Sequence, residues 1–364
     1  MKRIIPLLLI VCLLAGCAKA TPDKKETKGT TAPTEAEDVV TEPTTPEPEP
    51  PVVLYRHPLT GEPLEEPWTV RPVAVSVPNN KEVYPHHGTG SADILYEIEC
   101  DGDVTRMLAV FTNLNGIEKL GPVRSARTYL NNLAISYDAP IAHCGGSPGG
   151  RTGRYDSADG DTIANWPHID EMYNGSYFFR DTDRYYYQGY LWEYTLFTSG
   201  AGLKGAMDAR GYTEDAENPP VIDFGLTFGD ASSAAAGETA NTVLVEFRGS
   251  KSTTFNYKDG VYEVIQHGSV YTDANTDEAI TFRNVLALQA EQWYDGAGYR
   301  TYYDLIGSGT GYYACDGKIV PIKWERPTLR DAFSYTLEDG TPITLGVGTS
   351  YIAVIGQRGA VSYE

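Results

Sequence analysis

The sequence predicts an N-terminal α/β domain, with a mixed sheet and a βαβ crossover, and a C-terminal domain of mainly antiparallel β strands. Strand and helix patterns alternate between Val73 and Ala209. After about Thr213 they give way to short runs of alternating apolar and polar residues. The Ser- and Ala-rich stretch Asp230–Ala240 is typical of a linker or loop. We therefore place the N-terminal domain at 54–212, the linker or loop at 213–240, and the C-terminal domain at 241–364.

Three apolar runs mark the first strands, and a turn joins the last two. The runs are Val73–Val77, Asp93–Cys100 and Val104–Thr112. Asp101-Gly102 is a strong signal for a two-residue hairpin loop.

That hairpin register predicts an ion pair across the strands. Glu97 faces Arg106, and Glu99 lies on the same face of the sheet. In one interpretation these side chains line a polar cleft. In the other they form an exposed pair that contributes well under about 1 kcal/mol to stability.

A helix and a strand follow the hairpin. Residues Arg127–Tyr137 have helical spacing, with the apolar and aromatic side chains on one side. Ala139–Cys144 then returns as a strand. The order strand, helix, strand predicts a right-handed parallel crossover from Val104–Thr112 to Ala139–Cys144.

Two loops of this crossover carry candidate binding residues. The first reads Gly121-Pro122-Val123-Arg124-Ser125-Ala126-Arg127, and the second begins at His143 and is rich in glycine. We expect Ser125 to be the N-cap, so that both arginines flank a helix N-terminus, where N–H groups favour anions. Parallel strands would bring the loops together at their carboxyl ends. The expected ligand-binding residues are Glu97, Glu99, Arg106, Arg124, Ser125, Arg127, His143, Gly145, Gly146 and Ser147, with the two glutamates orienting the arginines' ligand. The alternative is that the arginines pair with surface carboxylates and the glycines form a turn.

The C-terminal part is predicted as a series of short strands. Lys258-Asp259-Gly260 is a turn signal between two alternating segments. The expected strands are Thr242–Phe247, Thr253–Tyr257, Val261–His267, Asn284–Gln289, Tyr312–Ala314, Lys318–Trp324 and Ser350–Ile355.

The N-terminus has the pattern of a lipoprotein signal peptide. Lys2 and Arg3 precede a short apolar run, and Leu14-Ala15-Gly16-Cys17 is a lipobox. The apolar run is shorter than the roughly 20 residues of a membrane-spanning helix. We expect residues 1–16 to be removed, Cys17 to carry a diacylglycerol, and the protein to be anchored on the outer face of the bacterial cell membrane. The alternative is an ordinary secretory signal that contains a cysteine.

Residues 17–53 predict a disordered stalk. The segment is rich in Pro, Thr and Glu and has almost no large apolar residue, so it cannot bury a core. Its prolines are Pro22, Pro33, Pro43, Pro46, Pro48, Pro50 and Pro51. Such a segment acts as a semi-extended spacer.

The charge of the chain excludes some partners. The formal net charge is −20, and it becomes −22 when Lys2 and Arg3 leave with the signal. A strongly acidic surface argues against nucleic acid and against anionic lipid as partners. No sequence pattern indicates a cofactor or a metal site.

The cysteines give no disulfide framework. Cys12 leaves with the signal and Cys17 is expected to be lipidated, so Cys100, Cys144 and Cys315 remain. We expect buried free thiols; a Cys100–Cys144 bridge is the alternative if their strands adjoin.

Several motifs resemble those of a known family. They are Arg71-Pro72-Val73-Ala74-Val75, Asn79, Ala92–Glu97, Thr105-Arg106, Gly121–Arg127, His143–Ser147, Phe282–Val285, Gly307-Ser308-Gly309, Asp316-Gly317-Lys318, Trp324 and Asp339-Gly340-Thr341. With these motifs the chain resembles the YerB family of bacterial lipoproteins, over roughly Leu54–Gln357. The resemblance implies two globular regions and implies no particular reaction.

Two departures from the family pattern bear on catalysis. The resemblance implies Pro-His-Asn before Leu-Tyr-Thr-Ser, where this chain has Glu193-Tyr194-Thr195-Leu196-Phe197-Thr198-Ser199. It also implies His-x-Asp where this chain has Tyr271-Thr272-Asp273. Two imidazoles are therefore missing. If either acts as a base or a metal ligand in the family, this chain is impaired, and enzymatic activity is uncertain.

Aromatic residues are dense between Trp166 and Tyr194. They are Trp166, Tyr173, Tyr177, Phe178, Phe179, Tyr185, Tyr186, Tyr187, Tyr190, Trp192 and Tyr194. Tyr and Trp suit stacking on sugars or contact with a partner, but they also fill cores. His86-His87 has no nearby ligand set and is expected in a loop.

Three functions are compatible with the sequence. The first is a cell-surface lipoprotein that binds an anionic glycan, carboxylate or phosphate ligand, or an envelope protein. The second is a hydrolase of a cell-wall glycopolymer or ester, with His143 as base and Ser147 as nucleophile, although no Gly-x-Ser-x-Gly elbow is present. The third is a structural regulator of envelope proteins that docks through its C-terminal domain.

Overall fold

The computed structural model describes residues 55–100, 104–146, 166–213, 222–249, 251–294 and 301–364. The predicted signal peptide, the stalk and Ser147 lie outside the described residues. Val52–Glu364 form one compact unit. No described helix combines the length and the hydropathy needed to cross a membrane.

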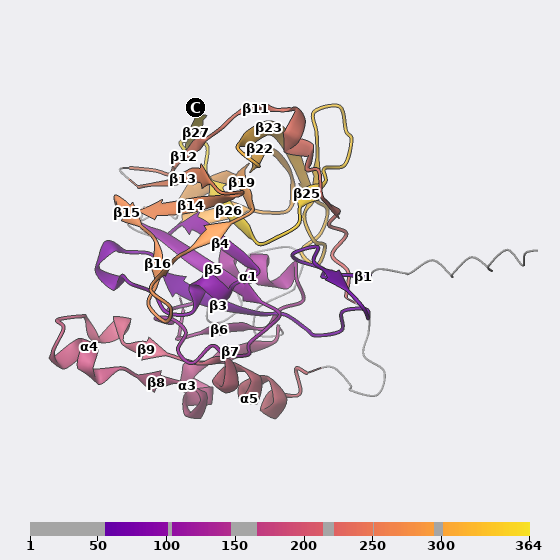
Figure 1. Cartoon of the computed structure of the whole chain (residues 1–364). Helices are drawn as coiled ribbons and strands as arrows, with labels where there is room; N and C mark the ends of the chain where they lie inside the picture. Colours follow the sequence, from indigo (N-terminus) through magenta and orange to yellow (C-terminus); the bar gives the residue numbers. More distant parts are fainter. Residues whose placement is uncertain (1–54, 101–103, 147–165, 214–221, 250, 295–300) are drawn as a thin grey trace, which may run out of the picture. The chain divides into compact units, whose positions relative to one another are not determined.

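An eleven-stranded mixed sheet runs through both predicted domains (Figure 1). Its order is β11 (Glu238–Thr239), β23 (Lys318–Arg326), β22 (Gly307–Cys315), β19 (Asn284–Gln289), β26 (Ser350–Ile355), β4 (Ile94–Glu99), β5 (Thr105–Phe111), β3 (Val73–Pro78), β6 (Ile141–His143) and β7 (His168–Asp170), with β24 (Ser334–Thr336) beside β23. The parallel pairing of β26 with β4 joins the two sequence regions. The boundary between 54–212 and 241–364 is therefore not a break in the sheet.

A second sheet of six antiparallel strands comes from the C-terminal region. It contains β15 (Ser269–Val270), β14 (Val261–Gln266), β13 (Ser252–Lys258), β12 (Thr242–Glu246) and β27 (Ala360–Tyr363) in that order, with β18 (Thr281–Phe282) beside β14. Buried and less buried residues alternate along β12 and β14, as expected for strands with one face toward a core. The predicted mixed sheet followed by mainly antiparallel strands is thus confirmed.

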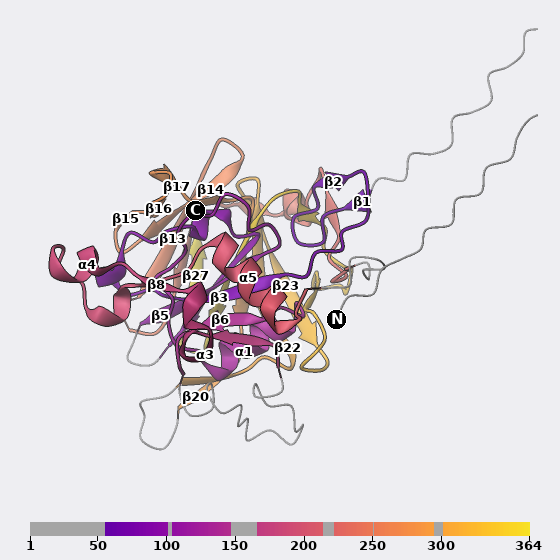
Figure 2. The ribbon, with the colours of Figure 1, turned by 90° about the horizontal axis from the view of Figure 1, so that it is seen from below.

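Helices and short strands complete the structure. The helices are α1 (Thr128–Ile135), α3 (Glu171–Asn174), α4 (Thr182–Tyr186) and α5 (Gly200–Arg210), with 3-10 turns η1 (Lys81–Val83), η2 (Thr89–Ser91), η4 (Gly175–Tyr177), η5 (Trp192–Tyr194) and η6 (Ser233–Ala236). The short strands are β1 (Tyr55–Arg56), β2 (Pro63–Leu64), β8 (Phe179–Arg180), β9 (Leu196–Phe197), β10 (Phe228–Gly229), β16 (Thr272–Asp273), β17 (Glu278–Ala279), β20 (Glu291–Tyr294), β21 (Thr301–Asp304) and β25 (Leu345–Gly346). The helices α3 and α5 lie near the β7 end of the large sheet, and the segment with β8 and α4 extends from there (Figures 1 and 2). In the predicted linker 213–240, η6 and β11 pack against β23, so its described part belongs to the fold.

Two hydrophobic clusters occupy the two faces of the large sheet. On one face, Tyr96 of β4 and Leu108 of β5 pack with Leu130 of α1. On the other, Leu95 and Met107 belong to a cluster that also contains residues of the second sheet. Both faces of β4 and β5 are therefore covered, and all their residues are buried.

The predicted parallel crossover is wrong in its strand arrangement. The strands β5 and β6 do not pair, because β3 lies between them. Since β3 is antiparallel to β5 and parallel to β6, β5 and β6 run in opposite directions. The position of the helix in the sequence was predicted correctly. The periodicity of a segment, however, does not show which strand will pair with which in the sheet.

The predicted register of the hairpin is wrong by one residue. Cys100 N donates to Val104 O at 2.6 Å, and the pairing continues with Glu99 opposite Thr105 and Glu97 opposite Met107. Three residues instead of two therefore separate the paired ends. Because side chains alternate between faces, this shift places Arg106 on the face opposite to Glu97, and the expected ion pair does not form.

Candidate functional site

An extended segment brings the two predicted loops together at the start of α1. Arg124 N donates to Ser76 O at 2.8 Å, beside the end of β3. Cys144 N donates to Arg124 O at 3.1 Å, and Ala126 N donates to Gly145 O at 2.9 Å. The loops therefore meet as expected, but through these backbone bonds and not through a parallel crossover.

Arg106 of β5 joins Arg124 and Arg127 at this place, and we name these three residues the arginine cluster. Arg106 is 6% exposed, and its Nη1 donates to Ser125 O at 2.7 Å. Burial lowers the pKa of Arg124, and the neighbouring positive charge of Arg106 lowers it further. The Nε atoms of Arg106 and Arg124 are buried, with no hydrogen-bond partner among the described residues. The cluster thus gathers cations and holds unused donors.

The Arg124 guanidinium also contacts the segment that follows α4. Its Nη2 lies 3.4 Å from Glu193 Oε1, in a pair whose glutamate side chain is 48% exposed. The guanidinium lies over the ring of Tyr194, 5.4 Å from its centre. Glu193 is the place where the first departure from the family pattern begins.

The prediction of Ser125 as N-cap is wrong. The helix α1 begins at Thr128, its N-cap is Arg127, and no side chain caps this end by a hydrogen bond. Ser125 instead contributes its carbonyl oxygen, which accepts from Arg106 and, at 3.1 Å, from Ser76 Oγ. A serine before a helical pattern is a common N-cap, but here the extended segment continues to Arg127, held by the bond from Ala126 N to Gly145 O.

His143 lies behind the loop and is 2% exposed. Its Nδ1 donates to Gly145 O at 2.8 Å and lies 4.0 Å from Asp170 Oδ1. Burial lowers the pKa of His143 although Asp170 opposes this effect, so the imidazole is neutral at pH 7. With Nδ1 as donor, Nε2 is an acceptor and cannot hold an anion.

The glycine loop offers fewer donors than expected. Gly145 adopts a φ of 61°, in the left-handed region that favours glycine, and its N–H donates to Asp170 Oδ1 at 3.1 Å. Gly146 forms an isolated bridge with Ala126. The Gly145 amide is therefore used within the protein.

Glu97 lies on the other face of the sheet, in a fully buried polar network. Its two carboxylate oxygens accept from Asn79 Nδ2 (2.7 Å), Thr105 Oγ1, Lys251 Nζ (3.3 Å), Thr253 Oγ1 (2.6 Å), Gln266 Nε2 (3.1 Å) and Tyr351 OH. Burial alone would raise the pKa of Glu97, but the Lys251 ammonium and the hydroxyl donors outweigh it and lower the pKa. No acceptor capacity remains for a ligand, and no local sequence pattern indicated Lys251 as the partner.

Glu99 is also buried on that face. Its Oε1 accepts from Tyr294 OH at 3.0 Å, and its Oε2 accepts from Arg248 N at 3.3 Å. The structure therefore separates Glu97 and Glu99 from the arginine cluster and brings together Arg106, Arg124, Ser125, Arg127, His143, Gly145 and Gly146.

The remaining cysteines and histidines do not form a site. Cys100, Cys144 and Cys315 are free thiols, and Cys144 is only half-buried. His86 is buried and bonds Tyr271 OH at 2.7 Å, and burial lowers the pKa of His86 to about 3. Tyr271 is the second departure from the family pattern. Within the described ranges, no group of three His, Cys, Asp or Glu residues is placed to hold a metal ion.

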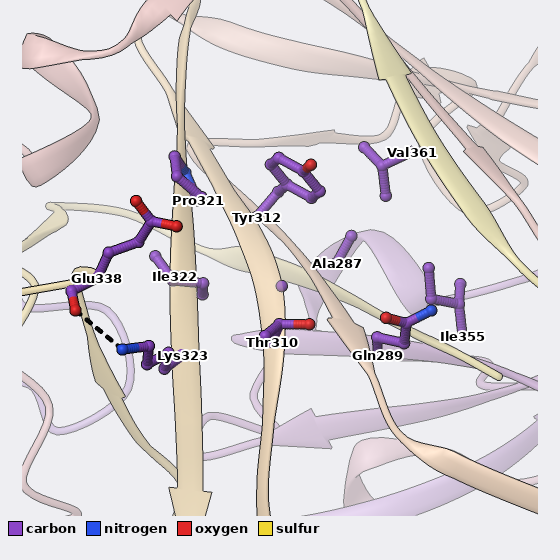
Figure 3. Close-up of a pocket in the computed structure, with 11 residues that line it drawn as sticks. Ala287, Gln289, Thr310, Tyr312, Pro321, Ile322, Lys323, Glu338, Ile355 and Val361 are labelled. Carbon is purple, nitrogen blue, oxygen red and sulfur yellow. Dashed lines mark hydrogen bonds between the residues drawn. The ribbon is translucent and has the colours of Figure 1, made fainter. Parts of the chain in front are cut away.

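A hollow of about 350 Å³ lies elsewhere, on β19, β22 and β23 (Figure 3). Gln289, Thr310 and Tyr312 line it, together with Lys323, whose Nζ donates to Glu338 O at 2.9 Å. It contains no residue of the predicted site. The functional site is better placed at the start of α1, where the Nε donors of Arg106 and Arg124 have no hydrogen-bond partner among the described residues.

Comparisons with known proteins agree with this architecture. The family described as "Protein of unknown function (DUF3048) N-terminal domain" matches residues 59–213, and the corresponding C-terminal domain matches residues 243–352. The chain is 28% identical to the protein named "Putative lipoprotein YerB" of Bacillus subtilis (strain 168) over 312 aligned residues. The alignment covers 84% of this chain and 87% of that protein. The crystal structure of the YerB protein from Bacillus subtilis matches with a TM-score of 0.66 at 25% identity, over 84% of this chain and 99% of that one.

Proposed function

The chain belongs to the YerB-like family with DUF3048 N- and C-terminal domains, and from this premise we propose that it is a lipid-anchored, extracytoplasmic protein that binds an anionic ligand of the cell envelope. The ligand group is a carboxylate or phosphate, and the arginine cluster holds it. The name of the Bacillus relative supports the anchor. The arrangement of Arg106 and Arg124 supports the ligand.

The observation that carries the proposal is the concentration of guanidinium groups in a strongly acidic chain. The formal net charge is −20, yet Arg106, Arg124 and Arg127 approach one another at one end of α1. Burial is the main cause that lowers the pKa of Arg124, and repulsion by the Arg106 and Arg127 guanidinium groups lowers the pKa further. An anion between them would relieve the repulsion and accept from Arg106 and Arg124, whose Nε atoms have no hydrogen-bond partner among the described residues.

The geometry of the arginines fits recognition better than structural pairing. Arg106 is held by the Ser125 carbonyl, which fixes the guanidinium without neutralising it. The contact between Arg124 and Glu193 is partly exposed, and such pairs contribute little to stability. A bound phosphate can replace this contact at small cost.

The double variant Arg124→Ala, Arg127→Ala tests the site. Isothermal titration with inorganic phosphate, wall fragments and phosphorylated glycopolymers is expected to show binding by the wild type. The double variant should bind about 100-fold more weakly, because each charge-assisted hydrogen bond contributes roughly 1.5–3 kcal/mol. Arg358→Ala, which removes an exposed cation elsewhere, serves as the control and should bind like the wild type. Unchanged affinity in the double variant would contradict the assignment of the binding site to the arginine cluster.

Metabolic labelling with a radioactive fatty acid tests the anchor. Cys17→Ser is expected to abolish incorporation of the label, because serine cannot form the thioether with diacylglycerol. The control Cys12→Ser changes a cysteine of the apolar run that precedes the lipobox and should leave incorporation intact. Label that persists in Cys17→Ser, or disappears in Cys12→Ser, contradicts the assignment of Cys17.

A further inference from the structure

Exposed apolar side chains gather on one segment, which we name the aromatic arm (residues 171–194). Of the twelve large hydrophobic side chains that are exposed in the described part of the chain, eight lie here. They are Met172, Tyr173, Phe179, Tyr185, Tyr186, Tyr187, Leu191 and Trp192. Six of the eight are aromatic. Such a concentration of exposed aromatic side chains on one segment is typical of a binding surface.

The arm is tied to the rest of the molecule, so its rings are presented on an ordered support. Arg184 of α4 is 3% exposed and donates from Nη2 to Val83 O at 2.9 Å. Asp181 accepts from the backbone N of Arg184 at 3.3 Å and forms an ion pair with Lys119. The exposure of the rings therefore does not arise from a loosely attached helix.

The rings of Tyr185 and Trp192 meet edge to face, with centres 5.5 Å apart. The Arg180 guanidinium lies over the Trp192 ring, 4.7 Å from its centre, and Arg180 Nη1 donates to Trp192 O at 2.8 Å. Trp192 is nevertheless 47% exposed. A cation thus lies over one face of a tryptophan ring that remains largely open to solvent.

The arm contacts the arginine cluster through the two residues that follow Trp192. Glu193 follows Trp192 in the chain and is the residue that approaches Arg124 at 3.4 Å. Tyr194, the next residue, lies under the Arg124 guanidinium. A ligand held by Arg124 would therefore extend over the arm.

We propose that the aromatic arm binds the sugar units of the same ligand, and that the ligand class is a phosphate- or carboxylate-bearing glycopolymer. This inference rests on the proposed function of the arginine cluster. Sugar rings present apolar C–H faces and polar edges, which match the flat faces and polar rims of Tyr and Trp. Arg180 and Arg124 complement the anionic groups along the chain.

The charge of the aromatic arm favours a glycopolymer over a membrane surface as its ligand. The arm carries four acidic residues, Glu171, Asp181, Asp183 and Glu193, against two basic residues, Arg180 and Arg184. Segments that bind anionic lipid instead carry clusters of Lys and Arg. The anion contacts of the arm are thus local and lie at the side of the arginine cluster.

Titration with poly(glycerol phosphate), with and without glucosyl substituents, tests the proposal, since the two polymers share their charge and differ in their sugars. The wild type is expected to bind the glucosylated polymer about tenfold more tightly. Trp192→Ala should abolish this difference and leave the affinity for the bare polymer unchanged. Trp293→Ala, which alters a tryptophan of 48% exposure on β20, is the matched control and should behave like the wild type.

The outcomes separate this inference from the proposed function. Equal affinity of the wild type for both polymers, or a preference that survives in Trp192→Ala, overturns the role of the arm and leaves the arginine cluster intact. Absence of binding both to the bare polymer and to wall fragments overturns the proposed function itself. Trp192-dependent binding to phosphatidylglycerol vesicles without a preference for the glucosylated polymer overturns the glycan assignment in favour of a lipid surface.

Discussion

Replacement of Glu97 by glutamine is expected to lower the free energy of unfolding by about 3–5 kcal/mol, as is typical when one member of a buried ion pair is removed. The variant leaves the Lys251 ammonium buried without its counter-charge, at 8% exposure. It also turns one acceptor oxygen into a donor facing groups that already donate. Urea denaturation of the wild type and the variant measures the difference.

A matched control and a double variant define the cause. Glu325→Gln alters an exposed glutamate of β23 and should change stability by less than about 0.5 kcal/mol. Combining Glu97→Gln with Lys251→Met removes both charges, so the double variant should lose less stability than the sum of the single variants. A loss below about 1 kcal/mol in Glu97→Gln contradicts the structural role of the pair.

The stability difference between the wild type and Glu97→Gln is expected to depend on pH. The pKa of Glu97 is lower in the folded protein than in the unfolded chain, where it is about 4.3. Its contribution to stability is therefore complete above that value and is lost as the pH falls through the folded pKa. The stability gap between wild type and Glu97→Gln should narrow below about pH 4, and a gap that widens on acidification would contradict the assignment.

Replacement of Arg326 by methionine is expected to lower the free energy of unfolding by about 3 kcal/mol. Arg326 at the end of β23 is fully buried and donates to backbone carbonyls: Nη2 to Asn132 O at 2.8 Å, Nε to Asp331 O at 2.9 Å, and Nη2 to Leu329 O. Methionine fills a similar volume but leaves these acceptors without their donor, at roughly 1–3 kcal/mol for each that stays buried.

Arg330→Met is the matched control for Arg326. Arg330 is exposed and lies over the Trp166 ring, so its loss should cost less than about 1 kcal/mol. Comparison of the two variants by urea denaturation isolates the effect of the buried guanidinium. Equal losses would show that Arg326 does not connect α1 to the C-terminal strands as its bond to Asn132 indicates.

Glu97 and Arg326 connect the two sequence regions on opposite faces of one sheet. Glu97 of β4 contacts Lys251, Thr253 and Tyr351, whereas Arg326 of β23 contacts α1. The parallel pairing of β4 with β26 supports both sets of contacts. The two regions matched by separate family descriptions therefore share one core.

Local sequence patterns located most elements well. The predicted strands Asn284–Gln289 and Ser350–Ile355 coincide with β19 and β26, and Arg127–Tyr137 contains α1. Such segments are predictable because the direction of each side chain follows from the backbone period alone. The turn at Asp259-Gly260 is confirmed for the same reason, since both residues adopt positive φ angles of 50° and 89°.

The errors arose where a decision depended on distant residues. The Asp101-Gly102 signal favours a two-residue loop, but the strands β4 and β5 pair in a register shifted by one residue, with every residue of both strands buried. The insertion of β3 between β5 and β6 removed the predicted crossover. The bond between Arg124 N and Ser76 O nevertheless brought the predicted loops together.

The sequence by itself determined the places of the strands and of α1, the resemblance to the YerB family, and the lipobox and stalk pattern that predict a tethered protein. Only the tertiary structure decided that Arg106 lies on the face opposite to Glu97, that Glu97 is buried against Lys251, and that the rings around Trp192 face solvent. The physical reason is that periodicity reports whether a side chain is directed toward a core. Which residues meet there depends on strand order and register, and these follow from packing between segments far apart in the chain.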